Sequence, residues 1–302
     1  MDIGMIGLGK MGANMAERLV RGGHRTIGFD RDADAIAAAE KAGIEGVESV
    51  EALAAALPAP RTVWIMVPAG PIVEKVIESL LPHLEPGDII VDGGNSNYKD
   101  TIARSETVAA SGIHLVDVGT SGGIWGLAEG YSMMAGGPDE AIEHLRPAFE
   151  TLAPAADRGW GHTGPSGSGH FVKMIHNGIE YGLMEAYAEG FALLRAKEQF
   201  QLDLHQVSEI WRHGSVVRSW LLDLTARALE ENPTMEGVAP FVPDSGEGRW
   251  TVFEAIDLNV EAPVIALSLM RRIDSRDPFD YSDRMLSAMR GQFGGHAVRR
   301  ED

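Results

Sequence analysis

The sequence predicts two domains: an N-terminal doubly wound α/β domain with a mostly parallel sheet, and a C-terminal all-helical domain. Short apolar runs alternate with stretches of helical spacing over the first half of the chain, as a parallel sheet covered by helices requires. Beyond that half, helical spacing continues without a convincing strand. A length of 302 residues, 44% of them hydrophobic, also suits two cores better than one. We therefore predict domains over residues 1–163 and 164–302.

The composition narrows the classes of function. A net charge of −18 and a pI near 4.9 argue against a nucleic-acid partner, which would need a basic surface. No apolar run approaches the length of a membrane span, and the chain starts on a strand without a charged leader, so we expect a cytoplasmic protein. The absence of cysteine excludes disulfides and thiol catalysis, and no histidine spacing is typical of a metal site. We expect chemistry without a metal.

The first strand leads into a glycine-rich loop. Residues 2–6 form a short apolar run, residues 13–20 have helical spacing, and Gly7-Leu8-Gly9-Lys10-Met11-Gly12 lies between them. A Gly-x-Gly-x-x-Gly motif between a strand and a helix is typical of the Rossmann fold, in which the glycines let a dinucleotide pyrophosphate approach the backbone. The alternative is an ordinary turn. We predict cofactor binding by Gly7, Gly9, Lys10, Met11 and Gly12.

The second strand indicates which dinucleotide is bound. Residues 25–29 form a strand that ends in Asp30, about twenty residues after the glycines. A carboxylate there accepts hydrogen bonds from the adenosine ribose and repels a 2′-phosphate, which favours NAD over NADP. Arg31 follows directly, and because its guanidinium can pair with that phosphate, NADP is the alternative. We predict that Asp30 and Arg31 bind the cofactor and that NAD is preferred.

Three further strands, at residues 62–67, 88–92 and 113–117, are each followed by small residues, with helices predicted over 71–81 and 98–111. Ligands of a doubly wound sheet bind beyond the carboxyl ends of its strands. Any one of these loops could be an ordinary turn, but three in succession predict a shared ligand groove. The loops are Val67-Pro68-Ala69-Gly70, Gly93-Gly94-Asn95-Ser96 and Gly119-Thr120-Ser121-Gly122-Gly123. We predict cofactor contacts at Val67, Pro68, Ala69 and Asn95.

The remaining elements are mostly helices. The last strands are expected at residues 131–137 and near 154–160, with a helix over 138–152 between them. A loop at residues 164–169 opens a proline-free stretch that we predict as one long helix ending near residue 195. Further helices are expected at about 203–213, 219–230, 250–259, 263–275 and 282–293.

The long helix carries a polar stripe. At about 100° of rotation per residue, Asn177 and Glu180 lie on either side of Lys173, with Tyr181 nearby. One face therefore combines an amide, a carboxylate, an amine and a phenol, which need a ligand, internal partners or solvent. A solvated face with i,i+4 pairs is the alternative to a binding site.

Two motifs are similar to those of a known family. His-Asn-Gly-Ile-Glu-Tyr-Gly at residues 176–182 and Asp-Gly-Gly-Asn-Ser at residues 92–96 closely resemble the signature of 6-phosphogluconate dehydrogenase, the decarboxylating enzyme of the pentose phosphate pathway and gluconate utilisation. The wider β-hydroxyacid dehydrogenase superfamily shares the glycine loop, the Ser-Gly-Gly turn and the Lys-x-x-x-Asn pair, but Glu180 and Tyr181 narrow the choice. The resemblance covers the chain from the glycine loop to the C-terminus and is to a compact variety of the enzyme.

This resemblance implies a reaction and the residues that carry it. Lys173 would take the proton of the C3 hydroxyl of 6-phosphogluconate while hydride leaves C3 for the nicotinamide, and the 3-keto acid would then lose CO2. Glu180 would deliver a proton to C1 of the enediol to give ribulose 5-phosphate, with Asn177 between the two residues to hold the substrate. The other implied contacts are Asn95, Ser121, Gly122, Gly123 and His176 for the sugar acid, and Tyr181 and Arg272 for its phosphate.

The C-terminal segment is also similar to the family. Arg290 and His296 resemble an arginine and a histidine with which the family's tail reaches into a neighbouring subunit's site. The resemblance implies that both residues bind substrate and that the active unit is a homo-oligomer, at least a dimer, with a tetramer as the alternative. A frayed basic terminus is the competing interpretation, since Arg299 and Arg300 follow directly.

One position departs from the family pattern. Ser245 stands where the long enzymes carry a phosphate-binding lysine, so either Arg249 or a main-chain group compensates, or phosphate affinity is weaker, or the substrate carries no phosphate. Two rival functions stay open: a β-hydroxyacid dehydrogenase of the 3-hydroxyisobutyrate type acting on a small acid, and a non-catalytic NAD-binding sensor. Glu180, Arg272, Arg290 and His296 argue against the first rival, because oxidation without decarboxylation needs no such acid and a small substrate needs no such phosphate cluster. Lys173 together with Glu180 argues against the sensor.

Overall fold

The chain divides into two compact units, and the division falls within one long helix. The computed structural model describes residues 1–278 and 280–294. The first unit comprises Met1–Asn177 and the second begins at Gly178, so helix α8 (Ser168–Ala196) contributes to both. The domain boundary between residues 163 and 164 stays a prediction.

The first unit is built on a mixed sheet. Among the described residues, its eight strands follow the order β3-β2-β1-β4-β5-β6-β7-β8, and every neighbouring pair is parallel except β6 and β7. The predicted doubly wound, mostly parallel sheet is therefore confirmed. The strands are β1 (Asp2–Ile6), β2 (Arg25–Phe29), β3 (Glu45–Gly46), β4 (Thr62–Ile65), β5 (Ile89–Asp92), β6 (His114–Ser121), β7 (Ser132–Gly136) and β8 (Trp160–Gly164).

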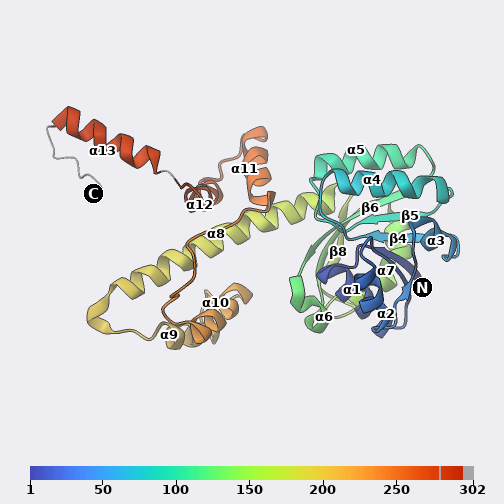
Figure 1. The fold of residues 1–302 in the computed structure, drawn as a ribbon, viewed down its shortest axis with the longest axis horizontal. Coiled ribbons are helices and arrows are strands. Elements are labelled where there is room, and N and C mark those ends of the chain that lie inside the picture. The colour runs from blue at the N-terminus through green and yellow to red at the C-terminus, as the bar shows by residue number, and fades with distance from the viewer. Residues whose placement is uncertain (279, 295–302) are drawn as a thin grey trace. The chain divides into compact units, whose positions relative to one another are not determined.

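Helices cover both faces of this sheet (Figure 1). Successive residues of a strand point to opposite faces, so Trp64 of β4 packs with one layer while Val63 and Ile65 pack with the other. Trp64 meets Phe149 edge to face, with ring centroids 5.9 Å apart. One layer holds α1 (Lys10–Arg21), α2 (Ala33–Glu40) and α7 (Asp139–Leu152), and the other holds α3 (Val50–Ala55), α4 (Pro71–Leu80) and α5 (Tyr98–Ala109).

The strand order reverses between β1 and β4, because the chain crosses over β1 after β3. A ligand groove of a doubly wound sheet is expected at such a switch point, beyond the carboxyl ends of the strands. The helices that follow these strands begin at defined signals. Gly70 precedes the proline that starts α4, and Asn97 caps α5 by accepting a hydrogen bond from the Lys99 N–H.

Two strand predictions need correction. β6 continues through Ser121, whereas residues 119–121 were expected in a loop, because antiparallel β7 supplies pairing partners beyond Asp117, where the pairing with β5 ends. The last strand is Trp160–Gly164 and not residues 154–160. Pro154 and the positive φ of Gly159 (+89°) place a turn there, and only from Trp160 does the chain pair with β7.

The described residues of the second unit form helices and connecting loops without a strand, as predicted, with α8 followed by five further α-helices. Asp203 and Ser219 cap two of them by accepting hydrogen bonds from main-chain N–H groups of the first turn. The helices are α9 (Leu204–Arg212), α10 (Trp220–Glu231), α11 (Glu247–Asp257), α12 (Pro263–Asp274) and α13 (Tyr281–Gly294).

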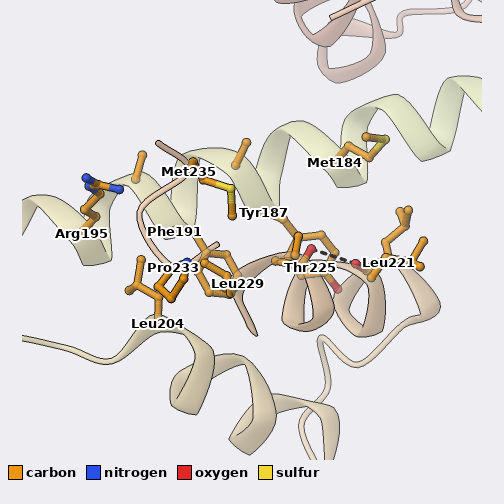
Figure 2. A pocket seen from close by; sticks show the side chains of 14 residues that line it. Met184, Tyr187, Phe191, Arg195, Leu204, Leu221, Thr225, Leu229, Pro233 and Met235 are labelled. Carbon is orange, nitrogen blue, oxygen red and sulfur yellow. Dashed lines mark hydrogen bonds between the residues drawn. The ribbon is translucent and has the colours of Figure 1, made fainter. Parts of the chain in front are cut away.

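A cavity of about 520 Å³ lies between α8, α9 and α10 in this unit (Figure 2). Its walls are mainly apolar, with Tyr187, Phe191 and Leu229 among the lining residues. Arg195 stands at its edge and donates a hydrogen bond to the carbonyl of Thr234 at 2.7 Å. None of the predicted site residues lines it.

Candidate active site

The glycine-rich loop joins β1 to α1 at the switch point of the sheet. Gly7 has a φ of +95°, and its N–H donates to the carbonyl of Phe29 at 2.9 Å. A Cβ on Gly12 would lie 1.9 Å from the carbonyl oxygen of Gly7, so only glycine lets the helix pack this closely on the loop. A Cβ at Gly9 would meet nothing within 4 Å, so open space lies in front of this position.

The N-terminus of α1 is built for an anion. Gly9 is its N-cap, no side chain caps the first turn, and the first turn contains no acidic residue. Main-chain N–H groups and the helix dipole attract phosphate at such an end. Lys10, which is exposed, and Met11, which is half-buried, lie in this turn. The loop and helix together fit the pyrophosphate of a dinucleotide.

Asp30 follows β2 and is held beside this loop. Its Oδ2 accepts a hydrogen bond from the Leu8 N–H at 2.7 Å, and its Oδ1 accepts one from the Asp32 N–H at 2.9 Å. Each carboxylate oxygen still has a lone pair for a ribose hydroxyl. Arg31, the competing residue, is exposed.

The loops after β4, β5 and β6 hold the next group of predicted residues. Val67 is half-buried, whereas Pro68 and Ala69 are exposed. Asn95 has a positive φ of +53°, and its side-chain amide bonds twice to Thr120: Nδ2 donates to the carbonyl at 3.2 Å and Oδ1 accepts from the N–H at 2.9 Å. Asn95 therefore ties its loop to β6 and keeps one N–H for a ligand.

The Ser-Gly-Gly turn follows directly on β6. Ser121 is the last residue of the strand, and Gly122 and Gly123 have φ values of +130° and +52°. Such values are in the left-handed region, which favours glycine at both positions. The turn therefore exposes main-chain groups at the end of the strand, as a contact with a sugar acid would need.

Lys173 lies in the second turn of α8 and is 5% exposed. A Cβ on Gly119 of β6 would lie 2.3 Å from the Cβ of Lys173, so the helix packs directly on the strand backbone. The Nζ of Lys173 is 3.3 Å from Nδ1 of His176, which lies 2.9 Å from Oδ1 of Asn177. The structure thus brings together these three predicted residues.

Asp117 of β6 holds the beginning of α8, a role that the motifs do not indicate. Its buried carboxylate accepts hydrogen bonds from the Gly167 N–H at 2.6 Å and the His170 N–H at 2.7 Å. Burial raises the pKa of Asp117, although His170 and the two N–H groups act in the opposite direction. These bonds anchor the helix one turn before Lys173.

In the second unit, Tyr181 lies at the centre of a polar cluster. The guanidinium of Arg272 lies over its ring, 3.5 Å from the centroid, and Nη1 donates to the carbonyl of Pro243 at 2.9 Å. The Tyr181 hydroxyl is 3.4 Å from the Ser245 Oγ, and Ser245 in turn donates to the Glu247 carboxylate. The two residues predicted to hold a phosphate are therefore neighbours, and Ser245 lies beside them.

Asp244 gathers two further arginines. Its Oδ2 is 2.7 Å from Nη2 of Arg249 and 3.6 Å from Nη2 of Arg276. Burial favours a higher pKa for Asp244, but the hydrogen bonds from Arg249 and the Gly246 N–H outweigh it and hold the pKa below its ordinary value. The family motifs miss Arg276. Its i,i+4 spacing from Arg272, near the end of one helix, is the signal that could have indicated it.

Three predicted residues remain: Glu180, Arg290 and His296. Glu180 is half-buried on α8, seven residues after Lys173. Arg290 is exposed on α13, and His296 lies outside the described residues. Over residues 1–278 and 280–294, no group of three or more histidine and acidic side chains is placed to hold a metal ion. No helix in that part of the chain has the length and apolar character needed to span a lipid bilayer.

Two family models match the two halves of the chain. The model described as the NAD binding domain of 6-phosphogluconate dehydrogenase matches residues 2–161. The model described as the C-terminal domain of 6-phosphogluconate dehydrogenase matches residues 169–279. Together they leave unmatched Met1, residues 162–168 and residues 280–302.

Individual proteins agree with the family models. An NAD(+)-dependent, decarboxylating 6-phosphogluconate dehydrogenase of Haloferax volcanii is 44% identical over 303 residues, covering 100% of both chains. The structure of Plasmodium falciparum 6-phosphogluconate dehydrogenase superposes with a TM-score of 0.84 at 28% identity, covering 100% of this chain and 66% of that one.

A Mycobacterium tuberculosis 3-hydroxyisobutyrate dehydrogenase has the same fold, with a TM-score of 0.72 at 23% identity over 88% of this chain and 90% of that one. The fold alone therefore does not separate the two kinds of dehydrogenase. The family models and the full-length sequence identity do separate them, and this chain belongs to the 6-phosphogluconate dehydrogenase family.

Proposed function

We propose that this chain catalyses the oxidative decarboxylation of 6-phospho-D-gluconate to D-ribulose 5-phosphate and CO2, with reduction of NAD. The observation that carries the proposal is the buried Lys173, which α8 holds against the last residues of β6. A relative that spans the same length and shares 44% of its residues is named for this NAD-dependent, decarboxylating activity.

The first unit fits the cofactor. The open space at Gly9, the uncapped N-terminus of α1 and the carboxylate of Asp30 suit the pyrophosphate and the adenosine ribose of NAD. Lys10, Met11 and the loop at residues 67–69 complete the set of residues that we assign to it. Bound NAD supplies the acceptor for the hydride.

Lys173 is assigned the role of general base. Its Nζ accepts the proton of the C3 hydroxyl while C3 gives up hydride. The resulting ammonium then donates a proton to the C3 carbonyl oxygen as the C1–C2 bond breaks and CO2 leaves. A β-keto acid decarboxylates readily once its carbonyl is polarised in this way. Asn177 and His176, which lie next to Lys173, are assigned to hold the substrate.

Glu180 is assigned the role of general acid. It delivers a proton to the enediol carbon that becomes C1 of the product, while Lys173 takes back the proton of the adjacent hydroxyl. Seven residues of α-helix correspond to about two turns, so both side chains belong to the same side of α8. This helical spacing supports the assignment.

Tyr181 and Arg272 are assigned to the substrate phosphate. Their stacked contact places a guanidinium and a phenol hydroxyl in one cluster, and both groups can donate hydrogen bonds to phosphate oxygens. Ser245 lies in the same cluster with its hydroxyl and main-chain N–H close to Tyr181. Arg249, in the first turn of α11, is the cation that we expect to replace the lysine of the long enzymes. Asn95, Ser121, Gly122 and Gly123 are assigned to the sugar acid.

A homo-oligomer is part of this proposal. Large apolar side chains of α12 and α13 are exposed, including Val264, Leu267, Leu286 and Met289, and such surfaces are typical of protein interfaces. We assign Arg290 and His296 to the site of a neighbouring subunit, in a dimer or a tetramer. The cytoplasmic location stays a prediction.

An initial-rate assay with 6-phosphogluconate and NAD, scored for both NADH and CO2, tests the proposal. We expect equal amounts of the two products. NADH without CO2 would favour an acid dehydrogenase without decarboxylation, and no turnover with any hydroxy acid would favour a sensor. In the same assay with NADP, kcat/KM should be lower, because Asp30 repels a 2′-phosphate. A preference for NADP would mean that Arg31 dominates.

A further inference from the structure

Arg104 is a buried arginine to which the proposed chemistry gives no role. It lies on α5, and its side chain is only 3% exposed. A charge at this depth is costly unless it is paired and hydrogen-bonded. The contacts of Arg104 therefore indicate which parts of the fold it connects.

The guanidinium of Arg104 connects the carboxyl end of β5 with the last residue of the loop that follows β4. Nη1 is 3.4 Å from Oδ2 of Asp92, the last residue of β5, whose side chain is fully buried. Nη2 donates to the carbonyl of Gly70 at 3.1 Å, at the end of the loop that follows β4. One side chain thus fixes the loop after β4 relative to the end of β5.

Asp92 extends this contact into the loop after β5. Its Oδ1 accepts a hydrogen bond from the Gly94 N–H at 3.1 Å, and its Oδ2 accepts one from the Ser96 hydroxyl at 2.8 Å. Asn95, between these two residues, is bound to the main chain of Thr120. The contacts therefore run without a break from the loop after β4, through the buried ion pair, to β6.

The other surroundings of Arg104 contribute less. Nη2 is also 3.9 Å from the carboxylate of Glu74 on α4, but that side chain is 57% exposed and the pair is long. Nε has no hydrogen-bond partner among the described residues. The contacts of the two Nη atoms with Asp92 and Gly70 therefore account for the position of the guanidinium.

We propose that Arg104 is a positioning residue for the cofactor: it sets the separation of the loops after β4 and β5 and thereby the affinity of the groove for NAD. The two Nη atoms of the guanidinium are both needed, because one contacts the Asp92 carboxylate and the other the Gly70 carbonyl. A single ammonium group cannot reproduce both contacts with the same geometry. This inference rests on the proposed function only in that the groove binds a nicotinamide dinucleotide.

The test is the dissociation constant of NADH, measured by fluorescence titration without substrate. Arg104→Met should raise it by about tenfold or more, because a charge-assisted contact that orders the groove is lost. Arg104→Lys, which keeps the positive charge opposite Asp92, should restore folding but only part of the affinity. The KM for 6-phosphogluconate should rise less than the dissociation constant of NADH, because only Asn95 among the residues held by these contacts is also assigned to the sugar acid.

Arg18→Met is the matched control. Arg18 of α1 donates to the carbonyls of Leu127, Thr151 and Ala153 at 2.8–3.1 Å, and none of these belongs to the cofactor loops. Both methionine variants should lower the melting temperature, but only Arg104→Met should weaken NADH binding. Equal weakening in both variants would attribute the effect to general loosening and overturn the proposal.

Two other results would also overturn it: unchanged NADH affinity in Arg104→Met, or full affinity in Arg104→Lys, which would mean that charge alone suffices. If Arg104→Met does not fold, the lysine variant still decides between these outcomes. The readout does not depend on which hydroxy acid is oxidised. An enzyme that shows the expected affinities but releases no CO2 from 6-phosphogluconate would refute the proposed function and leave this inference intact.

Discussion

The packing of α8 on the backbone of β6 places the Cβ of Lys173, and the Nζ lies 3.3 Å from Nδ1 of His176. A substitution that keeps the length of the side chain therefore tests its chemistry. Lys173→Met should lower kcat by about 10²–10⁴, because that is the usual contribution of a general base. NADH affinity should stay unchanged, since the glycine loop is untouched. Lys75→Met, at an exposed position of α4, is the control and should behave like the unmodified enzyme. Retained oxidation in Lys173→Met would contradict the assignment of the base.

Asp244 offers a test of the arginine cluster through pH. Its folded pKa is lowered, so its ionised form stabilises the fold above the unfolded value of 3.8, and this stabilisation is lost as the pH falls through the lower folded pKa. Asp244→Asn should therefore lower the free energy of unfolding at neutral pH by about 1–2 kcal/mol. The difference from the unmodified protein should shrink as the pH falls below 3.8.

Urea denaturation at a series of pH values measures this difference. Asp274→Asn is the control, because Asp274 pairs with Arg271 on the surface, where both side chains are more than half exposed. Such a pair contributes little, so this variant should differ from the unmodified protein by less than about 1 kcal/mol at any pH. A difference for Asp244→Asn that does not change with pH would exclude the ion pairs as its cause.

Sequence motifs indicate the residues that contact ligands. They indicate less well the residues that position these ligand-binding residues. The glycine loop, Asp30 and Lys173 each sit in a recognisable local pattern, because a ligand imposes residue types at fixed spacing. Arg104 and Asp117 do not, because each acts on partners that are far away in the sequence, such as Gly70 and His170. Only the folded sheet brings these partners together.

At the scale of elements, the contact between β6 and α8 sets where the proposed base lies. A Cβ at position 119 would come within 2.3 Å of the Cβ of Lys173 and 2.7 Å of the carbonyl oxygen of Gly169. Gly119→Ala should therefore push α8 away from the strand and lower kcat by roughly 10² through misplacement of the amine. It should also cost about 1–3 kcal/mol of stability, as overpacking does.

Gly161→Ala is the control for this variant. Gly161 lies in β8, and a Cβ there would meet nothing within 4 Å, so kcat and stability should both stay close to those of the unmodified enzyme. The kinetics are measured well below the melting temperature of each variant, with NADH affinity as an internal reference. A Gly119→Ala enzyme with normal kcat would mean that the helix position does not limit the reaction.

The elements themselves were largely predictable, and the two errors have a common cause. Helical spacing and caps predicted α9 to α13 to within three residues at either end, because these signals are local. The end of β6 and the start of β8 depend instead on pairing with β7, which is antiparallel to β6 and parallel to β8. A strand's own residues do not report which neighbour it will pair with, so its end cannot be deduced from them.

At the scale of the whole molecule, the C-terminal segment tests the proposed oligomer. Truncation after Gly291 removes His296, and we expect it to raise the KM for 6-phosphogluconate by about tenfold or more, because the contact of His296 with the substrate is lost. The KM for NAD should change far less. Truncation after Ala297 is the control, since it removes Arg299 and Arg300 with the last two acidic residues and leaves Arg290 and His296 in place. If both truncations behave alike, the tail does not reach a substrate.

The family could be recognised from sequence because its motifs come from both units of the chain. The glycine loop and Asp-Gly-Gly-Asn-Ser belong to the first unit, while Glu180 and Tyr181 belong to the second, and the family prediction is confirmed. The roles of individual site residues stay predictions. What replaces the phosphate-binding lysine is not visible in the motifs, because Arg249 and Arg276 come together only through Asp244.

The contacts that connect the loops after β4 and β5 with β6 affect how the cofactor preference of such an enzyme could be changed. Loops that follow parallel strands are usually treated as exchangeable parts of a fixed scaffold. Here the loops after β4 and β5 are joined by a side chain of α5, and the loop after β5 is joined to β6. A loop transplanted from another dehydrogenase would lack these hydrogen bonds and the ion pair. The smallest exchangeable part is therefore a loop together with Arg104, Asp92 and Asn95, and cofactor engineering would have to move them as one.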